Sequence, residues 1–160
     1  MSSSRQETPR QIGASGLEVG AEVGRRDLVL DRGMFEAFAA LTGDAHPIHY
    51  DDEYAQSRGL RAPIAHGLLL TAITALGAIP LSAQLGSSMI AMLGTQARFV
   101  SPVFVGETVT VTFRVAGIDP KTNNRSIVEL DVDVANDRGV LCVQARHRFM
   151  LLTALAEEVS

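Results

Sequence analysis

The sequence predicts an α+β fold in which one curved antiparallel sheet wraps around a long central helix. The first observation is the strongly apolar segment 66–85, which is typical of a helix buried on most sides. The second is the stretch after Ser88, where apolar and polar residues alternate in runs separated by short turns. Strands joined by short turns pair in antiparallel fashion, and such a sheet would bury the helix by curving around it.

Composition indicates a single globular domain. The 160 residues are 46% hydrophobic, enough to bury a core, and we expect one domain, 16–153, between a flexible N-terminal tail, 1–15, and a C-terminal tail, 154–160. The net charge is −4 and the basic residues are scattered, which argues against a nucleic acid partner. The single cysteine, Cys142, excludes an intrachain disulfide. We see neither a signal peptide nor a membrane span, and we expect a cytoplasmic location with no membrane partner.

The elements before the central helix are short. Residues 17–30 are suited to a strand, and a helix is expected from Asp31, a good N-cap, to Gly43, a good C-terminal residue. Residues 44–50 contain a proline and are expected to form an ordered loop. A second short helix is expected over 51–55.

Strands follow the central helix. The first is expected over 89–100, and 108–115 alternates valine and phenylalanine with polar residues, as a half-buried strand does. Two further strands are expected over 126–135 and 140–152, with a hairpin turn at 136–139.

The loop after the first helix carries the residues best suited to chemistry. Asp44 and His49 could share one water molecule, one group removing a proton while the other supplies a proton to substrate carbon. On spacing alone, an ordinary turn aspartate and a structural histidine are the simpler interpretation. Gly67 opens the central helix, where a free backbone N–H could polarise a carbonyl. A glycine there could also serve only close packing.

Two other kinds of site are considered. His46 and His49, with Asp44 and His66 nearby, could bind zinc or iron, but the histidines lie on a proline loop and no cysteine is near, so we expect no metal. Arg98 could hold the phosphates of a large substrate, as could two arginines near residue 60, because the guanidinium group suits phosphate. For any one of these arginines, an ordinary surface position is the simpler interpretation.

Three blocks of sequence resemble one known family. Residues 38–54 read FAALTGDAHPIHYDDEY, which resembles the signature of MaoC-like (R)-specific enoyl-CoA hydratases. The resemblance continues through APIAHGLL at 62–69 and QARFVSPVFVGETV at 96–109. It covers about residues 17–152, and it implies the hot-dog fold, a curved antiparallel sheet around a central helix.

The resemblance also implies roles for particular residues. Asp44 and His49 match the family's catalytic positions, and the N–H of Gly67 would polarise the thioester carbonyl. His46, Pro47, His66 and Arg98 are expected to contact the substrate. The family often has Asn where this chain has His46, and some members have Ser where it has Ala75, which puts the acyl preference in doubt.

The resemblance implies (R)-specific hydration of a trans-2-enoyl thioester, or the reverse dehydration, in fatty acid metabolism. The carrier would be CoA or acyl carrier protein, no cofactor would be needed, and the protein would form a homodimer or a larger homo-oligomer. Two alternatives remain: a thioesterase with the same fold, and a non-catalytic module that binds acyl-CoA.

Overall fold

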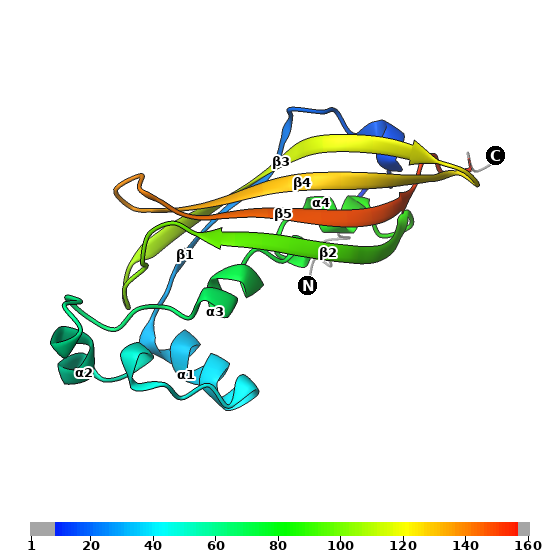
Figure 1. Ribbon diagram of the computed structural model, residues 1–160. Helices are drawn as coiled ribbons and strands as arrows, with labels where there is room; N and C mark the ends of the chain where they lie inside the picture. The colour runs from blue at the N-terminus through cyan, green and yellow to red at the C-terminus, as the bar shows by residue number, and fades with distance from the viewer. Residues whose placement is uncertain (1–8, 157–160) are drawn as a thin grey trace, which may run out of the picture.

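The computed structural model describes residues 9–156 and shows one antiparallel sheet with its helices on one face and at one end (Figure 1). The five strands lie in the order β1-β3-β4-β5-β2. Their bounds are β1 Glu22–Val29, β2 Met89–Phe99, β3 Thr108–Lys121, β4 Arg125–Asn136 and β5 Leu141–Leu152. The predicted α+β arrangement with a wrapped antiparallel sheet is therefore confirmed.

The helices are short. α1 spans Arg32–Thr42, α2 spans Asp52–Ser57, α3 spans Gly67–Ala72 and α4 spans Leu81–Gln84. Three 3-10 turns accompany them: η1 at Ala14–Gly16, η2 at Pro47–His49 and η3 at Leu76–Ala78. Within the described residues, none of these helices is long and apolar enough to cross a membrane.

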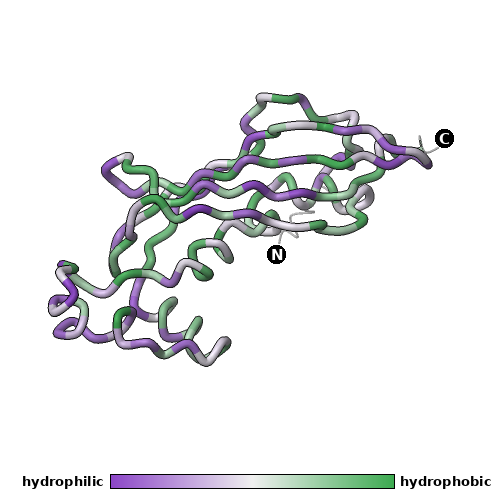
Figure 2. The backbone as a smooth tube through the Cα atoms, viewed as in Figure 1, coloured by the Kyte–Doolittle hydropathy of each residue, from purple (hydrophilic) through white to green (hydrophobic). Residues whose placement is uncertain are grey.

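Strand alternation builds the core. Every second side chain is buried along β4, along β3 as far as Val115 and along β5 from Val143. These strands therefore turn one apolar face toward the helices, and the alternation is visible along the sheet in Figure 2. The fully buried side chains of this face include Val111, Phe113, Val132 and Val134. The strands run longer than expected, because β3 continues to Lys121 and β4 starts at Arg125, with the tight turn between them.

The long central helix is the part of the fold prediction that was wrong in detail. Helical structure stops at Ala72 and resumes only as η3 and α4. The Thr74 hydroxyl donates to the Thr71 carbonyl at 2.6 Å, and the Ala75 N–H reaches back three residues to Ala72 instead of four. Such tightened bonds end an α-helix, and Pro80, which has no N–H, prevents an uninterrupted restart.

The ordered chain also begins earlier than expected. Residues 1–8 of the expected flexible tail lie outside the described residues, but 9–15 do not. Ala14 is fully buried, the Ile12 N–H donates to the Gln84 carbonyl at 2.9 Å, and the Ser15 N–H donates to the Thr153 carbonyl at 2.9 Å. This N-terminal segment therefore packs against α4 and the end of β5. Of the expected C-terminal tail, residues 157–160 lie outside the described part.

Candidate active site

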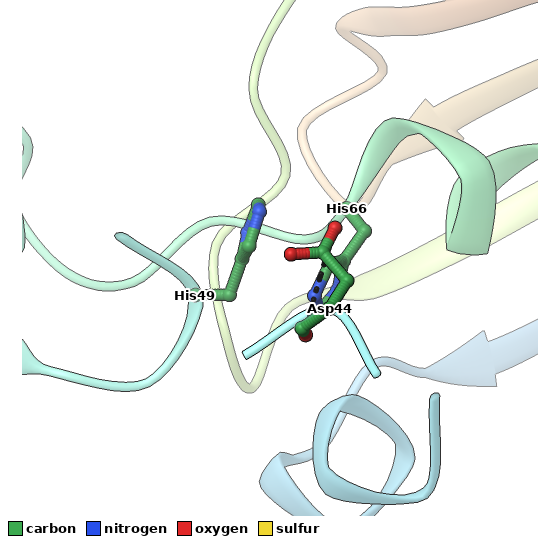
Figure 3. A group of neighbouring side chains, drawn as sticks. All are labelled: Asp44, His49 and His66. Carbon is green, nitrogen blue, oxygen red and sulfur yellow. Dashed lines mark hydrogen bonds and ion pairs between the residues drawn. The ribbon is translucent and has the colours of Figure 1, made fainter. Parts of the chain in front are cut away.

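Three titratable side chains from separate segments meet at the end of the sheet where α1 and α2 lie. Asp44 follows α1, His49 ends η2, and His66 is the N-cap of α3 (Figure 3). One oxygen or nitrogen atom from each lies within 4.8 Å of the other two. Asp44 and His49, which the sequence proposed as a pair, are thus brought together, and His66 completes the group.

The end of α1 positions Asp44. The Asp31 carboxylate caps the start of α1 by accepting from the Met34 N–H, as expected, and Gly43 ends it in the left-handed conformation with φ 78°. Beyond that turn the Asp44 N–H donates to the Thr42 hydroxyl at 3.2 Å, and the Asp44 Oδ1 accepts from the His46 N–H at 3.3 Å. The Asp44 side chain is 49% exposed, so its carboxylate remains accessible to water and substrate.

The η2 turn positions His49 and fixes its tautomer. Pro47 begins the turn, and the His46 ring caps it by accepting from the Ile48 N–H. The Nδ1 of His49 lies 2.7 Å from the carbonyl oxygen of Ile64. A carbonyl can only accept, so Nδ1 carries the proton and Nε2 is a free proton acceptor in the neutral ring.

His66 supports the other two groups. Its ring stacks on that of His49, with centroids 3.7 Å apart. Its Nε2 lies 3.2 Å from the Asp44 carbonyl oxygen, 2.9 Å from the Tyr50 hydroxyl and 4.0 Å from the Asp44 carboxylate. Burial, with a smaller contribution from His49, lowers the pKa of His66, so the ring is neutral with its proton on Nε2.

Tyr50 is a residue of this site that the sequence did not single out. Its hydroxyl lies within 3.1 Å of the Phe35 carbonyl, the Asp44 carbonyl and His66 Nε2, so it joins α1, the loop and α3. The pKa of Tyr50 is raised, first by burial and then by Asp44, which keeps the phenol protonated. The sequence signal that could have identified Tyr50 was its position directly after His49, at the end of the HPIHY run.

A cavity of about 350 Å³ opens beside this group. Its lining includes His49, Gly67, Leu70, Phe99 and Val103. Gly67 is the first residue of α3, and its N–H makes no hydrogen bond within residues 9–156. A Cβ at Gly67 would lie 2.8 Å from Cζ of Phe99, so the glycine keeps this wall of the cavity open.

The structure places three of the four predicted substrate-binding residues in or beside the cluster and the fourth on another face. His46 and Pro47 form the η2 turn that holds His49, and His66 lies in the cluster. Arg98 lies on β2, where its neighbour Phe99 faces Gly67, so the arginine points to the opposite face. There it lines a separate surface depression with Asp131 and Gln144, away from the cluster.

The metal alternative fits this geometry poorly. Asp44, His49 and His66 are close enough to surround an ion. A histidine ligand needs a bare nitrogen, however, and the Nε2 of His66 faces a backbone carbonyl, to which it donates its proton. The nitrogen that remains bare, Nδ1, is buried, whereas the Asp44 carboxylate lies 4.0 Å from the protonated Nε2. Two groups with a free acceptor, one carboxylate and one imidazole, suit proton transfer to and from water better than metal binding.

Known proteins share this sequence and structure. A family model described as the MaoC like domain matches residues 15–137. An (R)-specific enoyl-CoA hydratase of Aeromonas caviae is 32% identical over 132 residues, which cover 82% of this chain and 93% of that protein. Among solved structures, the (R)-hydratase of A. caviae covers 83% of this chain and 96% of its own, with 31% identity and a TM-score of 0.69.

Two further solved structures are similar over nearly the whole chain. The R-hydratase of Pseudomonas aeruginosa has a TM-score of 0.72 and 26% identity, covering 94% of this chain and 95% of its own. A protein described as the monoamine oxidase regulatory protein of Archaeoglobus fulgidus has a TM-score of 0.84 and 26% identity, covering 92% and 99%. The group thus includes proteins named as enzymes and one named as a regulator.

Proposed function

This chain belongs to the MaoC-like domain family and has its hot-dog fold. We therefore propose that it hydrates trans-2-enoyl-CoA to (R)-3-hydroxyacyl-CoA, or catalyses the reverse dehydration of (R)-3-hydroxyacyl-CoA. The observation that carries the proposal is one juxtaposition. A carboxylate on Asp44 and a bare imidazole nitrogen on His49 lie together beside a cavity that contains the free N–H of Gly67. Hydration of an enoyl thioester needs two groups that move protons and one that polarises the carbonyl.

The proposed reaction uses these three groups together. A water molecule held between Asp44 and His49 adds its oxygen to the β-carbon as the pair takes one of its protons. Electron density moves to the thioester oxygen, where the Gly67 N–H stabilises the enolate-like charge. The pair then delivers a proton to the α-carbon, so that both residues end as they began. Addition of both parts of water from one side gives syn addition.

His66 and Tyr50 act in this proposal as positioning residues. They hold the Asp44 backbone and the His49 ring by hydrogen bonding and stacking. Neither needs to exchange a proton with the substrate, because the neutral state of His66 and the raised pKa of Tyr50 keep both in one protonation state near neutral pH.

The proposal extends to assembly through β2. This strand lies at the edge of the sheet and leaves Ile90 and Leu93 substantially exposed. An open edge with apolar side chains favours pairing with another strand. We therefore propose a homodimer joined at this edge, for which light scattering on the purified protein is the measurement.

A second candidate is a module that binds acyl thioesters without turning them over. The observation in its favour is the likeness to the protein of A. fulgidus that is described as a regulator. Asp44 and His49, the two residues proposed to move protons, lie together beside the cavity that Gly67 lines, which favours the enzyme. Thioester hydrolysis is a third possibility, and release of free thiol would reveal it.

The deciding experiment follows loss of enoyl-thioester absorbance with crotonyl-CoA, and then with longer enoyl-CoAs. Asp44→Asn and His49→Gln should each lower kcat by about 10² to 10⁴-fold, because each removes a proton-transfer group. The matched control is Asp119→Asn, the same change at an exposed position outside the site. Chiral analysis should find the (R) product. Tight acyl-CoA binding with no turnover of any enoyl-CoA would refute the hydratase proposal and support the binding module.

A further inference from the structure

The segment between α2 and α3 carries groups on which the proposed reaction depends (Figure 1). In this 61–66 linker, the Ile64 carbonyl oxygen lies 2.7 Å from Nδ1 of His49. That contact keeps the ring proton on Nδ1 and leaves Nε2 bare. His66 ends the linker, and Gly67 follows it. The linker contains no helix and only a one-residue β-bridge, so contacts with other segments must set its position.

Backbone pairing with the segment before β3 holds only the second half of the linker. The Ala65 N–H donates to the Val103 carbonyl at 2.8 Å, and the Val105 N–H donates to the Pro63 carbonyl at 2.9 Å. The two segments run antiparallel, so they form a short piece of sheet. This pairing ends at Pro63, and Arg61 donates no backbone hydrogen bond within residues 9–156. The position of the start of the linker therefore depends on side chains.

The Arg61 side chain supplies the missing contact. Its Nη2 donates to Oε1 of Glu107 at 2.6 Å, and its guanidinium carbon lies 4.0 Å from the centroid of the Phe104 ring. The Glu107 side chain is 9% exposed and lies just before β3, and its Oε2 accepts from the Phe104 N–H at 3.0 Å. A buried carboxylate is costly unless it is paired, so this ion pair ties the start of the linker to the sheet.

A second arginine contacts the same carboxylate from elsewhere in the fold. The Nη2 of Arg138, in the hairpin between β4 and β5, lies 3.3 Å from the same Oε1 of Glu107. The side chains of Arg61 and Arg138 are 56% and 63% exposed, and neither lines the cavity beside His49. The two arginines thus share charge, exposure and partner, but only Arg61 belongs to the linker. An effect on the site that is specific to Arg61 must therefore pass through the linker.

We propose that Arg61 is a positioning residue, which through Glu107 holds the linker in the place that orients His49. With the ion pair formed, the Ile64 carbonyl accepts from Nδ1 of His49, and Nε2 stays bare. Without the ion pair, the start of the linker is released and this carbonyl shifts, so the proton of the neutral ring can occupy Nε2 instead. A ring protonated on Nε2 cannot take a proton there. The effect on catalysis rests on the proposed hydratase function, whereas the effect on the tautomer does not.

Steady-state kinetics on crotonyl-CoA compares Arg61→Met with the matched control Arg138→Met, each in the full chain. A misplacement of about 1 Å costs up to about 10²-fold in rate, and the two backbone bonds that remain limit the shift here. We expect kcat to fall about tenfold in Arg61→Met with KM nearly unchanged, and neither constant to change in Arg138→Met. An equal loss of kcat in both variants would overturn the inference.

The same kinetics separates positioning from a direct contact with the substrate. An arginine that only anchors the phosphates of CoA contributes equally to binding of the substrate and of the transition state, so its loss raises KM and leaves kcat unchanged. That outcome in Arg61→Met would overturn the inference and assign Arg61 to phosphate binding. Arg61→Gln also removes the charge but keeps a polar head group, and it serves if Arg61→Met does not fold.

Nuclear magnetic resonance of the histidine rings tests the tautomer without any substrate. The chain has four histidines, and the spectrum of His49→Gln identifies the His49 signals. Two-bond proton–nitrogen spectra, recorded at about pH 8 where imidazole is ordinarily neutral, show which ring nitrogen carries the proton.

The original protein and Arg138→Met should show His49 protonated on Nδ1 alone, and Arg61→Met should show a mixture of both tautomers. Absence of turnover on every enoyl-CoA would end the hydratase proposal, and the mixture in Arg61→Met would still support the positioning role. An unchanged His49 pattern in folded Arg61→Met would overturn the inference whatever the kinetics show.

Discussion

Replacement of Gly67 by alanine should lower enzymatic activity strongly and leave the stability of the protein nearly unchanged. The added Cβ would lie 2.8 Å from Cζ and 2.9 Å from Cε2 of Phe99. Carbon atoms in favourable contact are no closer than about 3.5 Å, so the ring must move by about 0.7 Å. Phe99 is 53% exposed, so its ring has room to rotate outward.

The change in stability is therefore small. Alanine restricts the unfolded chain more than glycine does, which stabilises the fold by about 0.4 to 1 kcal/mol where the backbone allows it. Displacing a half-exposed ring offsets part or all of this gain. We expect the free energy of unfolding to change by no more than about 1 kcal/mol in either direction.

The change in activity is large. The new methyl group stands at the wall of the cavity through which the thioester oxygen would approach the Gly67 N–H. Loss of one such donor lowers kcat by about 10² to 10³-fold in other enzymes that stabilise an oxyanion. Steady-state kinetics on crotonyl-CoA measures this loss, and thermal unfolding of the same preparation measures stability.

Gly117→Ala on β3 is the matched control, because a Cβ there would meet nothing closer than 4.0 Å. If Gly67→Ala does not fold, the double variant with Phe99→Leu removes the clashing ring atoms and keeps the added methyl group. Full kcat/KM in a folded Gly67→Ala protein would show that the thioester does not lie against this N–H, and the reasoning would be refuted.

Three further predictions follow from the same contacts. Tyr50→Phe removes the hydroxyl that joins α1, the loop and α3, so it should lower the free energy of unfolding by about 1 to 3 kcal/mol and should change kcat more than it changes KM. Unchanged urea midpoints and unchanged kinetics would contradict this. Burial lowers the folded-state pKa of His66 and His147, so below the ordinary value of about 6.5 the unfolded chain binds more protons, and the free energy of unfolding should fall as the pH drops. Urea midpoints measured across this pH range test this, and the dependence on pH should be weaker in His147→Phe. A flat profile in the original protein would count against buried neutral imidazoles. Dialysis against a chelator should leave hydration unchanged, whereas activity that is lost and then restored by zinc would identify a metal centre at Asp44.

Local signals predicted the parts of this molecule that depend on nearby residues. The caps Asp31 and Gly43 bound α1 as expected. The alternation over 126–135 predicted β4, which spans Arg125–Asn136. These features follow from hydrogen bonds and side-chain periodicity within a few residues, so one sequence suffices to find them.

Features that depend on distant contacts were missed. The break in the central helix includes a threonine bonded to His147, which lies 73 residues away. The role of Tyr50 depends on His66, and that of Phe99 on Gly67, and both pairs meet only in the folded chain. Apolar composition over 66–85 predicted burial on most sides; Leu69 and Leu70 are buried, but Leu68 is 69% exposed. Composition also carried no information on where tertiary hydrogen bonds would replace helical ones.

The broken helix has a consequence for the time scale of motion beneath the sheet. A continuous helix would couple its residues through one ladder of four-residue backbone bonds, whereas between α3 and η3 the N–H groups of Thr74, Ala75 and Ala78 reach back only three residues. Amide hydrogen exchange should therefore be faster from Thr74 to Ala78 than in β3 and β4, whose long paired ladders open only with the whole domain. Local opening of this turn would let the segment around Leu76 move without unfolding the sheet, while the end of the molecule that carries Asp44 and His49 stays fixed.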